Sequence, residues 1–254
     1  MPRTIDLNSD LGEGFGPYVF GSDEAMLSIV TSANVACGLH AGDPEIMATT
    51  FSLAGANNVS VGAHPGFPDL WGFGRRRIPF SLGEVERLIA YQVGAAAGVA
   101  ALAGQKLTYV KTHGALANIA AEDRTVADAI AKAVRAVDAS LALLATALTE
   151  QVSAGEAAGL RVYQEIYADR GYDDRGQLIA RNKPGAMVED VELAARRALE
   201  MVEQGAILTA SGKKLSTPIN SICVHGDSAG AVDLARLVRV TMEGAGITLA
   251  SFIP

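Results

Sequence analysis

Short β-rich runs alternate with longer segments of helical periodicity along the chain, and this alternation constrains the fold more than any other feature. The clearest helical segment carries an i, i+3, i+4 apolar stripe over residues 232–242. Strand, helix and strand repeated over 254 residues predict an α/β barrel in one domain, residues 1–254. The predicted strands are 5–8, 33–37, 59–62, 107–111, 141–145, 162–167, 206–209 and 222–224.

Two of these strands are less well defined than the others. The run 141–145 is short and rich in alanine, and the stretch 206–220 can instead hold a hairpin around Gly212. A barrel of seven units is therefore as consistent with the sequence as one of eight. An open doubly wound sheet is the alternative fold, but the glycine-rich segment 12–16 lacks the G-x-G-x-x-G spacing of a dinucleotide-binding turn.

Local signals mark two helix starts. Ser81 and Glu84 have the spacing of a capping box, and Asp43 stands directly before Pro44, which suits the first helical turn. The most uniformly apolar stretch, 93–104, is shorter than the roughly 18 residues of a membrane span. It is predicted to be a buried helix, and no membrane partner is expected.

Charge and cysteine content limit the partners and the compartment. The net charge is −7 and the pI about 5.1, which is the wrong sign for a surface that binds phosphate backbones, so nucleic acid is not expected. A strand predicted from residue 5 leaves no room for a cleavable signal. With two cysteines, Cys37 and Cys223, no disulfide framework is indicated; both are expected to be small buried hydrophobes in a cytoplasmic protein.

All four histidines of the chain follow the ends of predicted strands. They are His40, His64, His113 and His225. One such histidine is more often structural than catalytic, but in an α/β barrel the carboxyl ends of the strands meet on one rim, where active sites are built. We therefore expect these imidazoles to share a site.

Carboxylates, amides and a lysine accompany the histidines. Asp6, Asn8 and Asp10 alternate along the first strand and give it one wholly polar face, which needs partners or ligands when buried. Lys111 and Glu165 lie in two further strands, where an ion pair or a substrate contact is expected. The remaining candidates follow strand ends or precede helices, where helix capping alone explains the aspartates equally well; they are Glu13, Asn34, Asp43 and Asp227.

Two long loops complete the candidate site. The loop 64–76 is rich in glycine, proline and aromatic residues and ends in Arg75 and Arg76, whose guanidinium groups suit the carboxylate of a small anionic molecule. The loop 169–186 carries Arg170 and Arg181 and is predicted to act as a lid.

Two familiar motifs are excluded. Residues 226–230 match G-x-S-x-G, but a hydrolase of that type needs a histidine after the serine, and none follows His225. No G-x-x-x-x-G-K-[ST] phosphate loop occurs, so ATP chemistry would need another scaffold or another chain.

Several of these segments together resemble the LamB/YcsF family. The resemblance runs from residue 5 to about residue 250, with two departures, Thr112 and Ala117, on either side of His113. It implies a seven-stranded β/α barrel related to glycoside hydrolases and carbohydrate deacetylases. The matching blocks are 6–13, 32–44, 62–66, 72–76, 110–111, 113–116, 168–170 and 223–227.

The resemblance also implies an activity and partners. The family activity is the opening of 5-oxo-L-proline to L-glutamate coupled to ATP hydrolysis, in a complex with two further subunits. ATP with Mg²⁺ is the expected cofactor, wholly or partly bound by those partners. A metal-dependent deacetylase acting alone and a non-catalytic subunit that binds the lactam are the alternative interpretations.

Each candidate residue has an expected role. Asp10, His40, His64 and His113 are expected around the reacting carbon, with one histidine as general base. Lys111, held by Glu165, is expected to stabilise developing negative charge. Glu13 completes the candidate catalytic group. The candidates for substrate binding are Asn8, Asn34, Asp43, Arg75, Arg76, Arg170, His225 and Asp227.

A transition metal is not expected. The related deacetylases use an Asp-His-His set, and Asp10, His40 and His64 offer the same ligand types. The spacing matches no local metal motif, however, and a lysine nearby would repel a cation.

Overall fold

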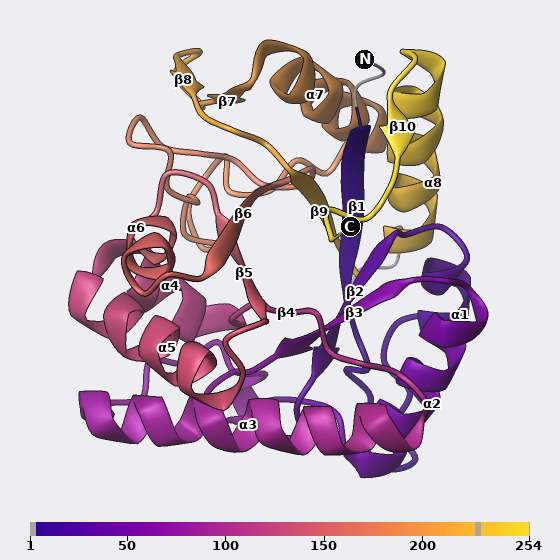
Figure 1. Cartoon of the computed structure of the whole chain (residues 1–254). Helices are drawn as coiled ribbons and strands as arrows, with labels where there is room; N and C mark the ends of the chain where they lie inside the picture. Colours follow the sequence, from indigo (N-terminus) through magenta and orange to yellow (C-terminus); the bar gives the residue numbers. More distant parts are fainter. Residues whose placement is uncertain (1–3, 227–229, 254) are drawn as a thin grey trace.

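The strands of the computed structural model, which describes residues 4–226 and 230–253, close into a parallel barrel (Figure 1). Neighbouring strands pair in chain order, and the last of them, β9, pairs with both β6 and β1 and so closes the ring. The short strand β10 (Thr248–Leu249) extends β1 at its amino end. The prediction of a seven-unit barrel is confirmed, with strands β1 (Thr4–Leu11), β2 (Ser32–Ala36), β3 (Ser60–His64), β4 (Tyr109–Val110), β5 (Ala142–Thr146), β6 (Arg161–Tyr167) and β9 (Ser221–His225).

The prediction of a barrel strand at 206–209 is wrong, whereas the hairpin alternative is confirmed. β7 (Ala206–Leu208) pairs antiparallel with β8 (Lys214–Ser216), and Gly212 has φ +88° in the turn between them. The stretch between β7 and β9 is described throughout and holds no helix, so the chain has no crossover with which to add β7 to the parallel sheet.

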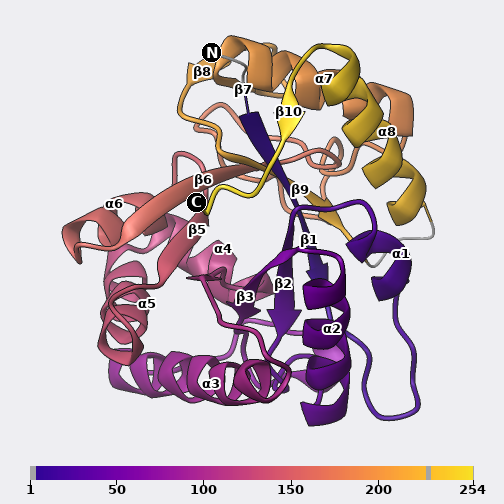
Figure 2. The same ribbon diagram turned by 45° about the vertical axis from the view of Figure 1, so that its right-hand side comes forward.

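Helices surround the barrel on its outer side (Figure 2). Both predicted starts are confirmed: Ser81 and Glu84 form a reciprocal capping box, and the Asp43 side chain accepts hydrogen bonds from the amides of Glu45 and Ile46. A 3₁₀ turn, η1 (Leu70–Gly72), lies in the loop after β3. The helices are α1 (Asp23–Leu27), α2 (Pro44–Ala56), α3 (Leu82–Leu102), α4 (Gly114–Glu122), α5 (Arg124–Val137), α6 (Glu150–Ala157), α7 (Val191–Gln204) and α8 (Ala231–Gly244).

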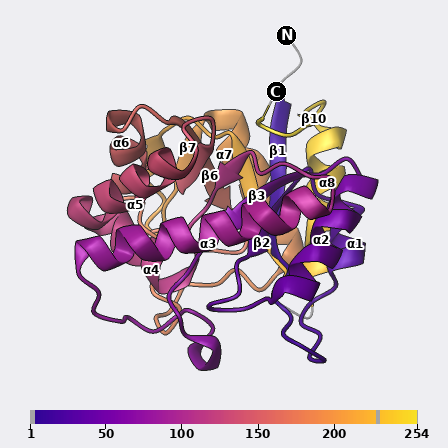
Figure 3. The ribbon, with the colours of Figure 1, turned by 60° about the horizontal axis from the view of Figure 1, so that its bottom comes forward.

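Helix α3 contains most of the apolar stretch that the sequence showed. It is the one helix in the described part of the chain that is long and apolar enough to cross a membrane, judged by length and composition alone. It lies along the outside of the barrel, packed against α5 and β3 (Figure 3), with Val85, Ile89, Val93 and Ala96 buried. A core helix meets the same criterion, and the burial of one face agrees with the predicted buried helix.

The interior of the barrel is apolar at one end and charged at the other. At the amino ends of the strands Tyr109 and Leu144 pack with Phe252 and Ile253. The Tyr109 ring takes the space above Gly62, where any Cβ would overlap it. The polar face of β1 points into the other half. Cys37 and Cys223 are buried and free, as predicted.

Candidate active site

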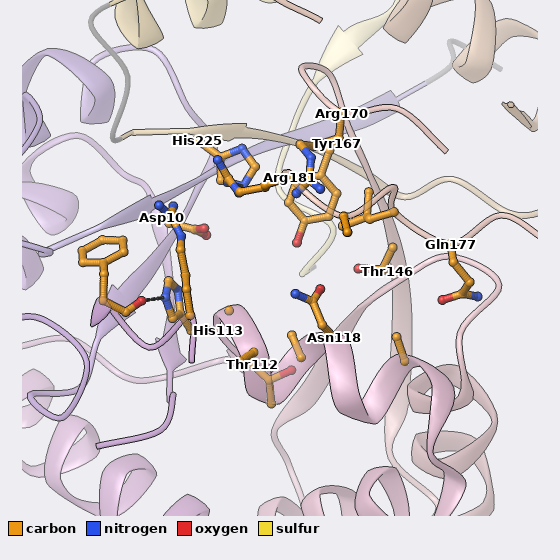
Figure 4. A pocket seen from close by; sticks show the side chains of 18 of the residues that line it. Asp10, Thr112, His113, Asn118, Thr146, Tyr167, Arg170, Gln177, Arg181 and His225 are labelled. Atoms are coloured by element: carbon orange, nitrogen blue, oxygen red, sulfur yellow. Dashed lines mark hydrogen bonds between the residues drawn. The ribbon is translucent and has the colours of Figure 1, made fainter. Parts of the chain in front are cut away.

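A cavity of about 510 Å³ opens at the carboxyl ends of the barrel strands (Figure 4). Its walls come from the ends of β1, β3, β6 and β9, from helix α4 and from the loops after β3 and β6. The structure therefore brings most of the predicted residues to one place. Those that line the cavity are Asp10, Glu13, His64, Arg75, His113, Arg170 and His225.

A buried lysine lies beneath the cavity between two carboxylates. Lys111 is 2% exposed, and its Nζ lies 3.0 Å from both Asp10 Oδ1 and Glu165 Oε2. Burial opposes its positive charge, but the two carboxylates prevail and raise the pKa of Lys111 well above its usual value. Burial likewise works against the charge of Asp10, yet His64 and Lys111 hold its pKa well below normal. The predicted pairing of Lys111 with Glu165 is present.

Two predicted binding residues belong to this network rather than to the cavity wall. Asn34 Nδ2 donates to Asn8 Oδ1 at 2.7 Å and to Asp10 Oδ1 at 2.8 Å. Asn8 Nδ2 donates to Glu165, and its Oδ1 accepts from Lys111 at 3.2 Å. Both amides thus fix the positions of charged groups and lie below the place where a substrate would bind.

Three of the four histidines form a cluster beside Asp10. His64 Nδ1 lies 2.8 Å from the Lys111 carbonyl, and His113 Nε2 lies 2.8 Å from the Phe73 carbonyl. The remaining nitrogens, His64 Nε2 and His113 Nδ1, are 3.1 Å apart. The His40 ring stacks on that of His113, with centroids 3.8 Å apart.

The cluster is held in a dry environment that keeps two of its members neutral. Burial, then the neighbouring imidazoles, lowers the pKa of His40 well below its usual value. Burial and the nearby His64 lower the pKa of His113 to about 3. Gly74, at φ +65°, lies so close that a Cβ there would be 2.7 Å from His113 Cδ2 and 2.8 Å from His40 Cβ. Backbone packs directly on the imidazoles, so the cavity side is their open side.

The fourth histidine lies apart from the cluster, on the opposite flank of Asp10. His225 Nδ1 is 2.8 Å from Asp169 Oδ2, and its Nε2 is 3.3 Å from Arg181 Nη2. Burial opposes the charge of Asp169, but His225 lowers its pKa below normal. The His225 ring stacks on Tyr167 at 5.1 Å.

The loop 169–186 borders the cavity, where the sequence predicted a lid. Arg170 donates to the carbonyls of Ala186 and Ile179, so much of its guanidinium fixes the loop, although the residue also lines the cavity. Arg181 and Gln177 reach the cavity from the same loop.

Two predicted binding residues are engaged elsewhere. Arg76 is absent from the cavity wall and forms an ion pair with the buried Asp69, with its Nε 2.9 Å from Asp69 Oδ1, whereas Arg75 lines the cavity. Asp43 caps α2 and accepts from the Gly16 amide, as the capping interpretation expected. Asp227 lies outside the described residues.

Several lining residues were not predicted. Asp169 and Tyr167 stand at or just after the end of β6, so the rule that found the histidines could have found them. Asn118 and Gln177 carried no such signal. Both departures from the family pattern, Thr112 and Ala117, line the cavity.

The closed barrel and its cavity of imidazoles and carboxylates define a β/α-barrel enzyme site suited to acid–base chemistry on a small polar molecule. The chain belongs to the LamB/YcsF family, whose sequence profile matches residues 5–254.

Similar proteins match over essentially the whole chain. The A subunit of a 5-oxoprolinase from Azorhizobium caulinodans is 59% identical over 254 residues, with 100% of both chains covered. The protein of the same name from Gluconobacter oxydans is 56% identical, with 97% of each covered. The crystal structure of a lactam utilization protein from Thermus thermophilus has a TM-score of 0.92 at 42% identity, covering 98% of this chain and 99% of that one. A deacetylase with substrate, at 13% identity and a TM-score of 0.51, shares the fold alone.

Proposed function

We propose that this chain is the lactam-handling subunit of a 5-oxoprolinase and takes part in the ATP-dependent opening of 5-oxo-L-proline to L-glutamate. The observation that carries the proposal is the full-length similarity to proteins named as the A subunit of 5-oxoprolinase, at 59% identity in one case. The cavity supports it, because about 510 Å³ is ample for a five-membered lactam that bears a carboxylate.

The substrate would bind with its two ends on different walls of the cavity. Arg75 and Arg181 reach the cavity from separate loops, and a guanidinium group pairs well with a carboxylate. We assign the substrate carboxylate to Arg75, which leaves the lactam carbon near Asp10 and the histidine cluster. Arg76 is not assigned to the substrate, because Asp69 holds it.

The chemistry has to overcome the stability of the lactam. Transfer of the γ-phosphoryl group of ATP to the lactam oxygen releases ADP and makes the ring carbon electrophilic. Water then adds to this carbon, a base among Asp10, His64 and His113 takes its proton, and the C–N bond breaks with a proton going to nitrogen. A second water molecule releases phosphate and L-glutamate.

Lys111 acts through Asp10 in this scheme. It lies below the cavity wall, 3.0 Å from Asp10 Oδ1, so it orients that carboxylate and holds it charged. It is a positioning residue rather than a group that touches the lactam.

We place ATP and its Mg²⁺ wholly or partly on two partner subunits, and the complex in the cytoplasm, where ATP is plentiful. The relatives support this assembly in that their names describe one component of an enzyme with several different chains.

The test is reconstitution with the two partner proteins. Glutamate formation from 5-oxoproline is measured with all three proteins and ATP, and with each component omitted in turn. Activity that needs ATP and every protein is expected. Turnover by this chain alone without ATP, or no turnover by the complete set, would contradict the proposal.

A pair of neighbouring arginine variants tests the assigned orientation. Arg75→Ala is expected to raise the KM for 5-oxoproline at least about tenfold, because a charged hydrogen bond to the carboxylate contributes roughly 1.5–3 kcal/mol. Arg76→Ala, with its partner Asp69 on the loop, is expected to leave KM within about twofold. An equal rise in both variants would contradict the assignment to Arg75.

A further inference from the structure

The hydrogen bonds of His64 and His113 determine which ring nitrogens carry protons. A backbone carbonyl only accepts, so His64 Nδ1 must donate to the Lys111 carbonyl and His113 Nε2 to the Phe73 carbonyl. In the neutral rings the other nitrogens, His64 Nε2 and His113 Nδ1, therefore present lone pairs. These two atoms face each other at 3.1 Å.

Two lone pairs at this distance repel unless a cation lies between or beside them. A single proton shared by the pair would serve, but it would involve only two donors. Two more converge here: Glu13 Oε1 lies 3.9 Å from both His113 Nδ1 and His40 Nε2. One donor atom from each of the four residues lies within 4.8 Å of the others.

His40 is the second independent observation. It is 1% exposed, and neither of its ring nitrogens has a hydrogen-bond partner in the described part of the chain. Buried polar atoms are nearly always satisfied, so an orphaned imidazole directed at three other donors indicates a missing partner.

We propose that His64 Nε2, His113 Nδ1, Glu13 and His40 bind one divalent transition-metal ion at the wall of the cavity. Nitrogen and carboxylate ligands at about 2.1 Å from a tetrahedral ion lie about 3.4 Å apart, so the four donors need only small adjustments. Imidazole-rich sites favour zinc, iron or nickel over magnesium or calcium.

The surroundings have the features of a metal site. Ligating histidines usually donate their other ring N–H to a carbonyl or carboxylate, as His64 and His113 do here. Glu13, His64 and His113 line the cavity, which gives an ion a way in. The His40 ring lies parallel to that of His113, at 6° between planes, so it must turn slightly to reach the same ion and contributes least.

The structure also removes the objection drawn from the sequence. Lys111 was expected to repel a cation, but Asp10 and Glu165 neutralise it at 3.0 Å each. The donor set also differs from the one weighed there, because Glu13 and His113 take part and Asp10, bound to Lys111, does not.

The test measures binding and does not depend on the lactam reaction. Protein purified without chelators is analysed for metals, then stripped with dipicolinate and titrated calorimetrically with Zn²⁺. Titration with Co²⁺ adds a visible absorption spectrum that reports nitrogen ligation. We expect one ion per chain, and at least a 100-fold loss of Zn²⁺ affinity in His64→Gln and in His113→Gln.

His225→Gln is the matched control, since it removes the one histidine outside the cluster and is expected to keep full stoichiometry. Circular dichroism and thermal melting establish that each variant is folded; if a glutamine variant does not fold, the corresponding asparagine variant replaces it. Folded wild-type protein that binds less than about 0.2 equivalents would overturn the proposal in favour of a shared proton. So would an equal loss of affinity in His225→Gln.

Discussion

Replacing Lys111 by methionine is the sharpest test of the charge network beneath the cavity. The substitution keeps most of the side-chain volume but removes the positive charge that lies between Asp10 and Glu165, each 3.0 Å from Nζ. Breaking a buried ion pair from one side costs about 3–5 kcal/mol, because the remaining charge loses its compensation. For a chain of this length, that corresponds to a fall in melting temperature of roughly 6–20 °C.

Urea unfolding of Lys111→Met and wild-type protein at neutral pH gives the difference in unfolding free energy. Lys132→Met is the control, because the Lys132–Glu86 pair lies on the surface and is worth about 0–1 kcal/mol. Adding Glu165→Gln to Lys111→Met removes one of the two unpaired charges, so the double variant should be more stable than the sum of the single effects predicts. A folded Lys111→Met within about 1 kcal/mol of wild type would refute the reasoning, which rests on the cost of unpaired buried charge.

Three further predictions concern other residues. Burial raises the pKa of Asp6 to about 6 from 3.8, so its neutral form is favoured in the fold and its contribution to stability, present below pH 4, is lost as the pH rises through 6. Relative to Asp6→Asn, urea unfolding should show wild-type stability falling by on the order of 3 kcal/mol from pH 4 to 7; a constant difference would contradict this. Gly74→Ala should lower activity and stability more than Gly212→Ala, since both have positive φ but only Gly74 touches His40 and His113; equal losses would exclude crowding. Thr112→Val should cost about 1–3 kcal/mol by leaving the buried Gln151 without its donor, whereas Thr112→Ser should restore it.

Local pattern was sufficient for most of the fold. The caps at Ser81 and Asp43 could be predicted because each depends on residues two or three positions away. The strand at 206–209 could not be placed, since its apolar residues fit a barrel strand and a hairpin equally well. What decides between them is the connection to the next strand.

The site was predictable to the extent that it follows strand ends. That rule placed Asp10, His64 and His113 on one rim, where the structure has them. It could not show that Asp69 engages Arg76 or that the Asn8 amide lies below the cavity, because side-chain pairing across the barrel depends on register. The convergence of lone pairs on a common point likewise depends on ring orientation, which sequence does not encode locally.

The closure of the barrel has a consequence for the time during which the chain is synthesised. One edge of β1 pairs with β2, which follows soon after it, but the other edge pairs with β9, which begins only at Ser221. At roughly 5–20 residues per second, that edge waits roughly 10–40 s for its partner. Exposed strand edges invite pairing with other chains, and inward-pointing charged residues discourage it. The carboxylates of Asp6 and Asp10, which later form the charged end of the interior, therefore protect the unfinished strand from aggregation on the ribosome.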